Sequence, residues 1–301
     1  MKNNNKFNIN ENQNSEQDSL KIPLAIKLRH LLNPSAVLGI ILLTVIVFIA
    51  IFAPLVAPYD PLEVNISNNF MPPSSEHPFG TDDLGRDILS RTFYGIRISL
   101  LVAIAVLSFA VFFGIVVGAI SGFSGTLVDN IFMRITDIFL AFPALILAMA
   151  IAASLGASLF NAMLAVMVVW WPWYARLVRG NFLKLKNNLY IEAARSIGTS
   201  NFNIIFKQIL PNSMALILVM ASLDLGFAVI TTAGLSFVGL GAQPPTPELG
   251  AMISQGRSYI IDFWWIPTFP GLAIFMIVLG VNLIGDTIRD IMDPNLRRLV
   301  R

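Results

Sequence analysis

The chain alternates long apolar runs with shorter polar segments. Six of the runs have the roughly 17 to 25 residues that a helix needs to cross the hydrocarbon core of a bilayer, at 37–57, 98–120, 138–155, 159–175, 214–234 and 268–285. None of them alternates with the period of two that marks a transmembrane β-strand. The pattern therefore predicts an all-α polytopic membrane protein with six transmembrane helices.

The composition supports this prediction. Hydrophobic residues make up 55% of the 301 residues and charged ones only 13%, against about 25% charged residues in an average soluble domain, and the mean hydropathy is +0.71. The first run differs from a cleavable signal peptide because it begins late, is too long, and has Leu55 and Pro58 around Ala57, where cleavage needs small residues. We expect it to remain in the mature chain.

Lys and Arg are distributed unevenly among the segments that join the runs. If the N-terminus lies in the cytoplasm, the cytoplasmic segments hold sixteen of the 20 Lys and Arg residues, in groups of five, one, six and four along the chain. Cytoplasmic loops of membrane proteins carry the excess of these residues. We therefore expect both termini to be cytoplasmic and the protein to be a multi-pass protein of the plasma membrane.

These boundaries divide the chain into five parts. We expect a cytoplasmic N-terminal tail at 1–36, the first transmembrane helix at 37–57 and an external loop at 58–97. A core domain at 98–288 follows, with a long cytoplasmic loop at 176–210, and a cytoplasmic tail at 289–301 ends the chain. The first 20 residues are Asn-rich and too polar to form a core, so we expect them to be disordered.

The external loop contains a segment, FGTDDLGRDILSR, with the features of a helix start. Thr81 can serve as the N-cap, with Asp82 and Asp83 in the first turn, where the helix dipole favours acidic residues. Asp87 can pair with Arg91 one turn later. We therefore expect an amphipathic helix over 81–92, which either lies solvated on the outer leaflet or contacts another protein outside the cell.

Small and aromatic residues indicate how two of the runs pack. Gly114, Gly118 and Gly122 recur at every fourth position of the second run, the spacing that lets two helix backbones approach closely. The fourth run ends in aromatic residues followed by basic ones, a pattern typical of the boundary between membrane and water. The aromatic residues predicted to anchor this helix are Trp170, Trp171, Trp173 and Tyr174.

The polar segment between the fourth and fifth runs is predicted to form two helices joined by a sharp bend. In the first helix Tyr190, Ala194 and Ile197 would share one face. Glu192 would pair with Arg195 at the i,i+3 spacing. This short helix lacks the Lys-rich polar face of a helix that lies on a membrane surface, which favours contact with another protein.

The bend and the second helix follow from the next residues. Gly198 is expected to end the first helix, because a C-terminal cap needs a positive φ. Thr199 or Ser200 can then cap a second helix over 201–210. Pro211 suits the first turn of the fifth run. The segment would therefore be stiff and joined almost directly to the fifth transmembrane helix.

One charged residue lies inside a predicted transmembrane helix. Asp224 is near the middle of the fifth run, where an ionised carboxylate costs about 2.5 to 3.5 kcal/mol. We expect it either to line a pathway through the membrane and meet a cationic or polar group there, or to bond to a neighbouring helix or a partner subunit. Arg134 and Asp137, at the i,i+3 spacing near the inner membrane edge, are expected to form a structural pair.

The residues that several other functions need are absent from the sequence. There is no cysteine, and the net charge of +2 is too small to indicate nucleic-acid binding. A phosphate-binding G-x-x-x-x-G-K-[ST] loop and an H-E-x-x-H zinc motif are also lacking, so the chain has no ATPase site of its own and an enzyme is disfavoured. A secondary transporter would need an internal repeat and a relay of buried carboxylates or histidines, which we do not find.

Six motifs occur in order between residues 77 and 294: FGTDDLGRDILSR, WYARLVRG, EAARSIG, LPN, GLSFVGLGAQPPTPELGAM and GDTIRDIMDP. Together they resemble the second permease subunit of ABC importers for dipeptides and oligopeptides, a group that also includes nickel and glutathione importers. The polar segment resembles the family pattern of Glu-Ala-Ala, three residues, Gly, nine residues, then Ile-x-Leu-Pro. Here the pattern reads Glu192, Ala193, Ala194, Gly198 and Leu210-Pro211, with Gln208 where Ile is usual.

This resemblance implies the fold of an ABC type I importer permease. The chain would form a translocation pathway for di- or oligopeptides with a second permease, two cytoplasmic ATPase subunits that bind ATP, and an external substrate-binding protein. Nickel, a metal chelate or glutathione is the alternative substrate, and the chain itself would bind no cofactor or metal. The resemblance implies that the ATPase-coupling residues are Tyr190, Glu192, Ala193, Ala194, Arg195 and Gly198.

Overall fold

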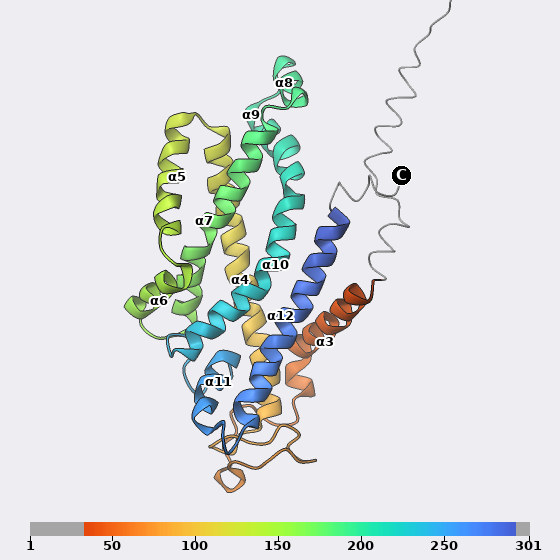
Figure 1. Cartoon of the computed structure of the whole chain (residues 1–301), viewed down its shortest axis with the longest axis vertical. Helices are drawn as coiled ribbons and strands as arrows, with labels where there is room; N and C mark the ends of the chain where they lie inside the picture. Colours follow the sequence, from red (N-terminus) through yellow and green to blue (C-terminus); the bar gives the residue numbers. More distant parts are fainter. Residues whose placement is uncertain (1–32, 293–301) are drawn as a thin grey trace, which may run out of the picture.

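The computed structural model describes residues 33–292, which form a bundle of long helices (Figure 1). The helices are α3 (Pro34–Val56), α4 (Ile88–Phe123), α5 (Thr126–Leu140), α6 (Ala144–Leu155), α7 (Leu159–Leu185), α8 (Leu189–Ser196), α9 (Asn201–Ile204), α10 (Leu210–Phe237), α11 (Leu249–Gly256) and α12 (Trp265–Met292), with short turns η1 (Ile66–Asn68), η2 (Ile205–Ile209) and η3 (Arg257–Tyr259). Within the described residues, β structure is limited to one isolated bridge. The all-α prediction is confirmed, and the predicted tails at 1–36 and 289–301 fall largely outside the described residues.

Four helices of the described chain are long and apolar enough to cross a membrane. They are α3, α4, the continuous helix Asn201–Phe237 and α12, and they correspond to the first, second, fifth and sixth predicted runs. α7 has 27 residues, which is long enough, but aromatic and charged residues make it less apolar than these four. The presence of apolar membrane helices is confirmed, and the count of six spans stays a prediction.

The run 138–155, predicted as one transmembrane helix, is not a single helix in the structure. α5 and α6 are separate helices that meet at 87°. The break lies just before Pro143, which has no N–H to continue the helix and whose ring disfavours helical geometry at the preceding residue, Phe142. Hydrophobicity alone could not show this break, because the run 138–155 continues apolar on both sides of it.

The helices are arranged so that α4, α7 and α10 run through the middle of the bundle (Figure 1). α12 and α3 lie on one side of them, and α5 and α6 on the other. α8 projects at one end, called the α8 end below, whereas α11 and the loop 57–87 occupy the opposite end, the α11 end. Buried Val106, Val166, Val229 and Ile277 belong to the main core, where α4, α7, α10 and α12 meet.

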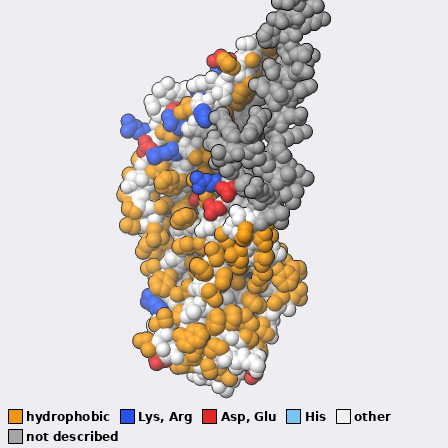
Figure 2. All heavy atoms as spheres, turned by 45° about the vertical axis from the view of Figure 1, so that its right-hand side comes forward, with side chains coloured by type: hydrophobic (Ala, Val, Ile, Leu, Met, Phe, Trp, Pro, Cys, Tyr) orange, Lys and Arg blue, Asp and Glu red, His pale blue; other side chains and the backbone are white. Residues whose placement is uncertain are grey.

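The outer surface suits a membrane. On the face in Figure 2, hydrophobic side chains cover the middle and lower parts, whereas most charged side chains gather nearer the α8 end. On α3, Ile41, Phe48 and Ile51 are 55%, 51% and 61% exposed. Helices that face lipid present such surfaces, because lipid tails are as apolar as these side chains and burial inside the protein gains nothing over them.

Close packing of α7 on α4 depends on Gly114, Gly118 and Gly122. A Cβ atom at Gly118 would lie 2.5 Å from the carbonyl oxygen of Ala175 on α7. Cβ atoms at the other two glycines would come within 2.7 Å of α7 side chains. The small-residue spacing therefore predicted close packing of α4 correctly, and the two backbones lie as close as glycine allows.

The loop before α4 does not form the predicted helix over 81–92. α4 begins only at Ile88, and its N-cap is Asp87, whose carboxylate accepts a backbone hydrogen bond of 2.7 Å in the first turn. Upstream, Gly80 and Gly85 have φ angles of 74° and 72°, a left-handed backbone geometry that a continuous α-helix cannot contain. The local charge pattern of a helix start was present, but the glycines prevent a helix.

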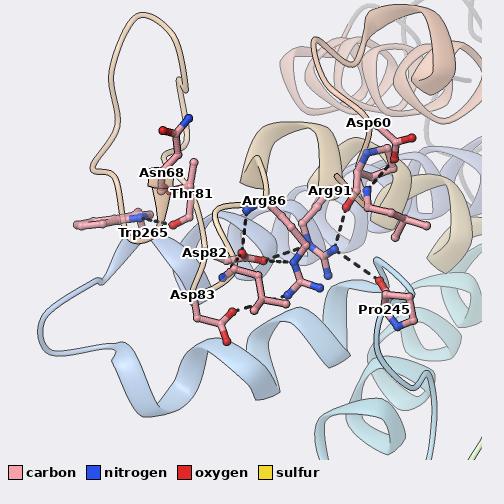
Figure 3. A network of polar contacts seen from close by, with 12 residues as sticks. Asp60, Asn68, Thr81, Asp82, Asp83, Arg86, Arg91, Pro245 and Trp265 are labelled. Atoms are coloured by element: carbon pink, nitrogen blue, oxygen red, sulfur yellow. Dashed lines mark hydrogen bonds and ion pairs between the residues drawn. The ribbon is translucent and has the colours of Figure 1, made fainter. Parts of the chain in front are cut away.

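A buried ionic network occupies this loop (Figure 3). Asp82 lies between two guanidinium groups, with Oδ2 2.7 Å from Arg86 Nε and 3.6 Å from Arg91 Nε. Arg91 also donates to the carbonyl oxygen of Pro61 at 2.9 Å. The three charged side chains are 8% exposed or less. The expected solvated helix is therefore wrong, and so is the expected pair of Arg91 with Asp87, whose place is taken by Asp82.

α11 ties α4 and α10 together at this end. A Cβ atom on Gly250 would lie 2.6 Å from the Cα atom of Ala233 on α10. The N-cap of α11 is Glu248, 2% exposed, whose carboxylate accepts from the Ala251 nitrogen at 2.9 Å and from the Ser99 hydroxyl of α4 at 3.3 Å. Burial raises the pKa of the Glu248 carboxyl. No local pattern in the sequence singled out this carboxylate.

Gly118→Ala is expected to destabilise the protein by about 1 to 3 kcal/mol, because the added methyl group must push α7 away from α4. Gly180→Ala, on α7, is the matched control, since nothing lies within 4 Å of its Cβ position and alanine favours a helix. Thermal unfolding of the two purified variants in detergent measures the difference. Equal unfolding temperatures would show that the glycine contact does not limit the packing.

Asp82→Asn should destabilise the protein by about 3 to 5 kcal/mol, because two buried guanidinium groups lose their counter-charge. Asp83→Asn is the control: its side chain is 39% exposed and 3.7 Å from Arg86, so we expect a loss below about 1 kcal/mol. The yield of monodisperse protein and its unfolding temperature report both effects. A stable Asp82→Asn protein would mean that the network does not hold the loop.

Candidate functional site

α8 turns Ile191 and Ala194 toward the body of the protein. The two side chains are 0% and 7% exposed, and Ile191 joins an apolar cluster with Phe182 of α7. Of the three residues predicted to share one face, only Ala194 is buried, since Tyr190 is 43% and Ile197 83% exposed. That prediction overlooked Ile191, whose large apolar side chain gains more from burial than alanine does.

The end of α8 has the predicted geometry. Gly198 has a φ of 81°, and the Thr199 nitrogen donates to the carbonyl oxygen of Ala194 at 3.0 Å, as in a helix that ends on a left-handed residue. Of the two candidate caps for the next helix, Ser200 is the one used, with its hydroxyl oxygen 3.4 Å from the Asn203 nitrogen. The chain therefore bends immediately after α8, at Gly198.

The helix after the bend continues into α10 without a break. α9, the π-helical turn η2 and α10 form one helix of 37 residues. Pro211 lies in the first turn of α10, as predicted. In a regular α-helix its ring would clash with the carbonyl group of Lys207, and the wider π turn lies at that position. A single bend at Gly198 therefore separates α8 from a membrane helix.

The tip of α8 is exposed and partly apolar. Its two most exposed apolar side chains, at 82% and 83%, are Leu189 and Ile197. Glu192 is exposed between them, and Arg195 places its guanidinium group 5.6 Å from the ring centroid of Phe123, at the end of α4. Among residues 33–292, Arg195 forms no ion pair with Glu192, so the predicted pair is not found. Exposed apolar side chains on a stiff projection are typical of a contact site for another protein.

A cavity of about 240 Å³ lies between α7 and α10. The residues that line it are Trp173, Tyr174, Arg176 and Leu177 of α7 and Met220 and Asp224 of α10. Its wall is mostly apolar or aromatic, with Asp224 and Arg176 as the charged members. Two of the aromatic residues predicted to anchor α7 at the membrane boundary thus form part of a cavity wall.

Asp224 contacts a neighbouring helix and also lines the cavity. Its role in a pathway stays a prediction. The hydroxyl group of Tyr174 donates to its Oδ2 at 2.7 Å. Tyr174 is 1% exposed, and its Cβ atom lies against Gly114. The partners are 50 residues apart, so no local pattern could have joined them.

The ion pair at the rim of the cavity differs from the prediction. Asp137 lies 2.6 Å from Arg176 of α7 rather than next to Arg134, its neighbour along α5. Both partners are about half exposed, and α5 lies close enough to α7 to favour this contact. In the described part of the chain, no group of three or more acidic or histidine side chains is placed to hold a metal ion.

Comparison with known proteins places the chain in a family. Residues 114–298 match the model of the binding-protein-dependent transport system inner membrane component, and residues 28–73 match the N-terminal transmembrane domain of oligopeptide transport permease C. An inward-facing structure of the MetNI methionine ABC transporter covers 71% of this chain and 96% of its own, with a TM-score of 0.54 at 21% identity. The predicted importer-permease fold is therefore confirmed.

Relatives with higher identity cover most of the chain. The chain is 44% identical over 262 residues to the probable D,D-dipeptide transport system permease protein DdpC of Escherichia coli, covering 87% of this chain and 88% of the relative. It is 46% identical over 265 residues to the dipeptide transport system permease protein DppC of Alkalihalophilus pseudofirmus, covering 88% and 87%. With the glutathione transport system permease protein GsiD of Pectobacterium atrosepticum it shares 42% over 276 residues, covering 89% and 90%. The chain therefore belongs to the binding-protein-dependent transport system inner membrane components, among the C-type permeases of the dipeptide and oligopeptide importers.

Proposed function

We propose that the chain is one of two permeases in an ATP-driven importer and that its substrates are di- or oligopeptides. The names of two of the relatives above point to dipeptides. The similarity to a glutathione permease supports glutathione, itself a tripeptide, as the alternative substrate. Two cytoplasmic ATPase subunits and an external substrate-binding protein complete the importer, and ATP binds to the ATPases.

The observation that carries this proposal is the position of α8. Leu189 and Ile197 at its exposed tip lie in solvent. Exposure of these apolar side chains is unfavourable in water, and a partner that covers them would remove that cost. Only the bend at Gly198 lies between α8 and the 37-residue helix that bears Asp224. A partner that moves α8 therefore moves a membrane helix, and a separate ATPase can drive transport in this way.

The coupling residues have two different tasks in this proposal. Tyr190, Glu192, Ala193 and Arg195 are exposed and offer the surface that an ATPase subunit binds. Ala194 is buried and keeps α8 on the protein body, while Gly198 supplies the left-handed turn. The small Ala193 side chain lets a partner approach the backbone of α8 closely.

The proposed topology puts the α8 end in the cytoplasm. The largest group of Lys and Arg between two runs lies around α8, which agrees with the excess of positive charge in cytoplasmic loops. Six passages result if α7 and the bent α5–α6 pair each cross once, together with α3, α4, Asn201–Phe237 and α12. The division into two tails, a first helix, the external loop 58–97 and a core then follows, and the α11 end faces the substrate-binding protein.

The cavity between α7 and α10 is the proposed part of the translocation pathway. In this cavity the Asp224 carboxylate lies next to open space. It therefore avoids the free-energy cost of an ionised carboxylate in contact with lipid. A secondary transporter would use such a carboxylate in a proton or ion relay with further buried acidic groups. In the described residues Asp224 has Tyr174 as its hydrogen-bond partner, which favours a binding role over a relay.

Glu192→Lys is expected to abolish ATP-driven uptake by the reconstituted complex, because it reverses a charge at the centre of the proposed ATPase contact. Membrane insertion and unfolding temperature should not change, since Glu192 is exposed. Lys184→Glu, an exposed charge reversal just before α8, is the control and should keep uptake near the wild-type rate. Gly198→Leu should also abolish uptake, because leucine is strained at a φ of 81°. Normal uptake by both α8 variants would refute the coupling proposal.

Uptake of labelled dialanine into proteoliposomes that contain the complete importer tests the substrate. We expect ATP-dependent uptake of the label. Unlabelled di- and tripeptides should inhibit this uptake, and nickel ions should not. Uptake of labelled glutathione without uptake of labelled dialanine would make glutathione the substrate. Proteoliposomes that contain this chain alone are the control, and uptake by them would show a secondary transporter.

A further inference from the structure

We propose that Asp224, Tyr174 and Trp173 form a subsite for the α-ammonium group of the transported peptide. The proposal rests on the proposed function and adds the chemical group that the cavity between α7 and α10 recognises. It predicts that peptides with a free N-terminus bind in this cavity and that peptides with a blocked one do not.

Within the part of the chain that the structure describes, one oxygen atom of the Asp224 carboxylate accepts a hydrogen bond, and the other does not. The Tyr174 hydroxyl group donates to Oδ2 at 2.7 Å, and Tyr174 is itself fixed by burial against α4. Within residues 33–292, Oδ1 has no hydrogen-bond partner, although Asp224 lines a cavity large enough for several heavy atoms. A carboxylate held by one donor, with its second oxygen beside open space, is arranged to accept a hydrogen bond from a ligand.

The charges around the cavity favour a cation. Arg176 is already neutralised by Asp137 at 2.6 Å, so these two residues with Asp224 carry a net charge of −1. Inside a membrane a carboxylate without a cation nearby is costly. A peptide α-amino group has a pKa of about 7.7 to 8.0 and is therefore mostly protonated at neutral pH. An incoming ammonium group would supply the missing positive charge.

The remaining walls match the rest of a peptide N-terminus. Trp173 presents an aromatic ring in the same cavity, and aromatic faces attract ammonium groups. Leu177 and Met220 give an apolar surface beside them, and methionine adapts its shape to different neighbours. The subsite would thus bind the ammonium group, which all unblocked peptides share, and would accept different side chains at the first residue of the peptide.

The absence of cysteine from the chain makes a direct test possible. Met220→Cys introduces a single thiol into the cavity, and its labelling by a maleimide can be followed in the assembled importer with cysteine-free partner subunits and no ATP. Dialanine and ethylamine, at about 10 mM, are expected to slow labelling several-fold. N-acetyl-dialanine, which lacks the ammonium group, should leave the rate unchanged.

Two further variants complete the test. Asp224→Asn, added to Met220→Cys, should remove the protection by dialanine, whereas Asp224→Glu should keep part of it. Ile261→Cys, 91% exposed in the loop before α12, is the control thiol that no probe should protect. Equal protection by N-acetyl-dialanine, or protection that persists in Asp224→Asn, would overturn the proposal. So would a Met220→Cys thiol that never reacts, because the partner permease would then fill the cavity.

The outcome separates this proposal from the proposed function. If the wild-type importer takes up dialanine but dialanine does not protect the cavity thiol, the subsite is refuted and the peptide importer stands. If the complete importer does not take up peptides at all, the proposed function itself fails.

Discussion

The contact between α4 and α7 determines the positions of both candidate functional regions. Glycines at every fourth position of α4 let α7 approach until side-chain atoms touch backbone. Tyr174 lies against Gly114, and its hydroxyl group reaches Asp224 of α10. Eight residues further along each helix, about two turns, Phe182 lies against Gly122 of α4 and packs with Ile191 of α8. One stretch of helix packing therefore sets the wall of the cavity and the base of the projecting helix.

The two ends of the bundle are held by different forces. Near α8 the contacts of α10 are apolar, and the ion pair of Arg179 with Asp129 in this region joins α7 to α5 and does not involve α10. The start of α10 can therefore shift without separating charges. At the α11 end, Arg91 joins α4 to two loops through Pro61, Pro245 and Asp82, and any opening would leave buried charges unpaired at a cost of several kcal/mol. There, the absence of a side chain at Gly250 also lets α11 pack closely against α10. α10 is thus fixed more firmly at the α11 end than at the end where α8 is attached.

The sequence predicted the features that depend on local spacing. Apolar run length identified four membrane helices, and the every-fourth glycines indicated close packing of α4, because both are properties of a single helix. That α7 is the partner of these glycines could not be read from the sequence. Predictions failed where a few backbone-determining residues overrode a favourable pattern, as at Pro143 and at Gly80 and Gly85. Asp224 was recognisable as a charge in an apolar run, but its partner Tyr174 was not, because only the tertiary packing of α7 on α10 brings them together.

The π-helical turn between α8 and the membrane helix bears on how a movement could pass between them. Relaxing η2 to a regular α-helix would shift the register of α10 by one residue, a rotation of about 100°. A movement of α8 would then be absorbed at η2 and would not reach Asp224. Pro211 opposes that change, because in a regular helix its ring would meet the carbonyl group of Lys207. Asp224 lies 13 residues beyond Pro211, about 20 Å along the helix. Under the proposed function, the bend at Gly198 and not η2 is therefore where the angle changes, and the helix from Asn201 to Asp224 moves as one piece.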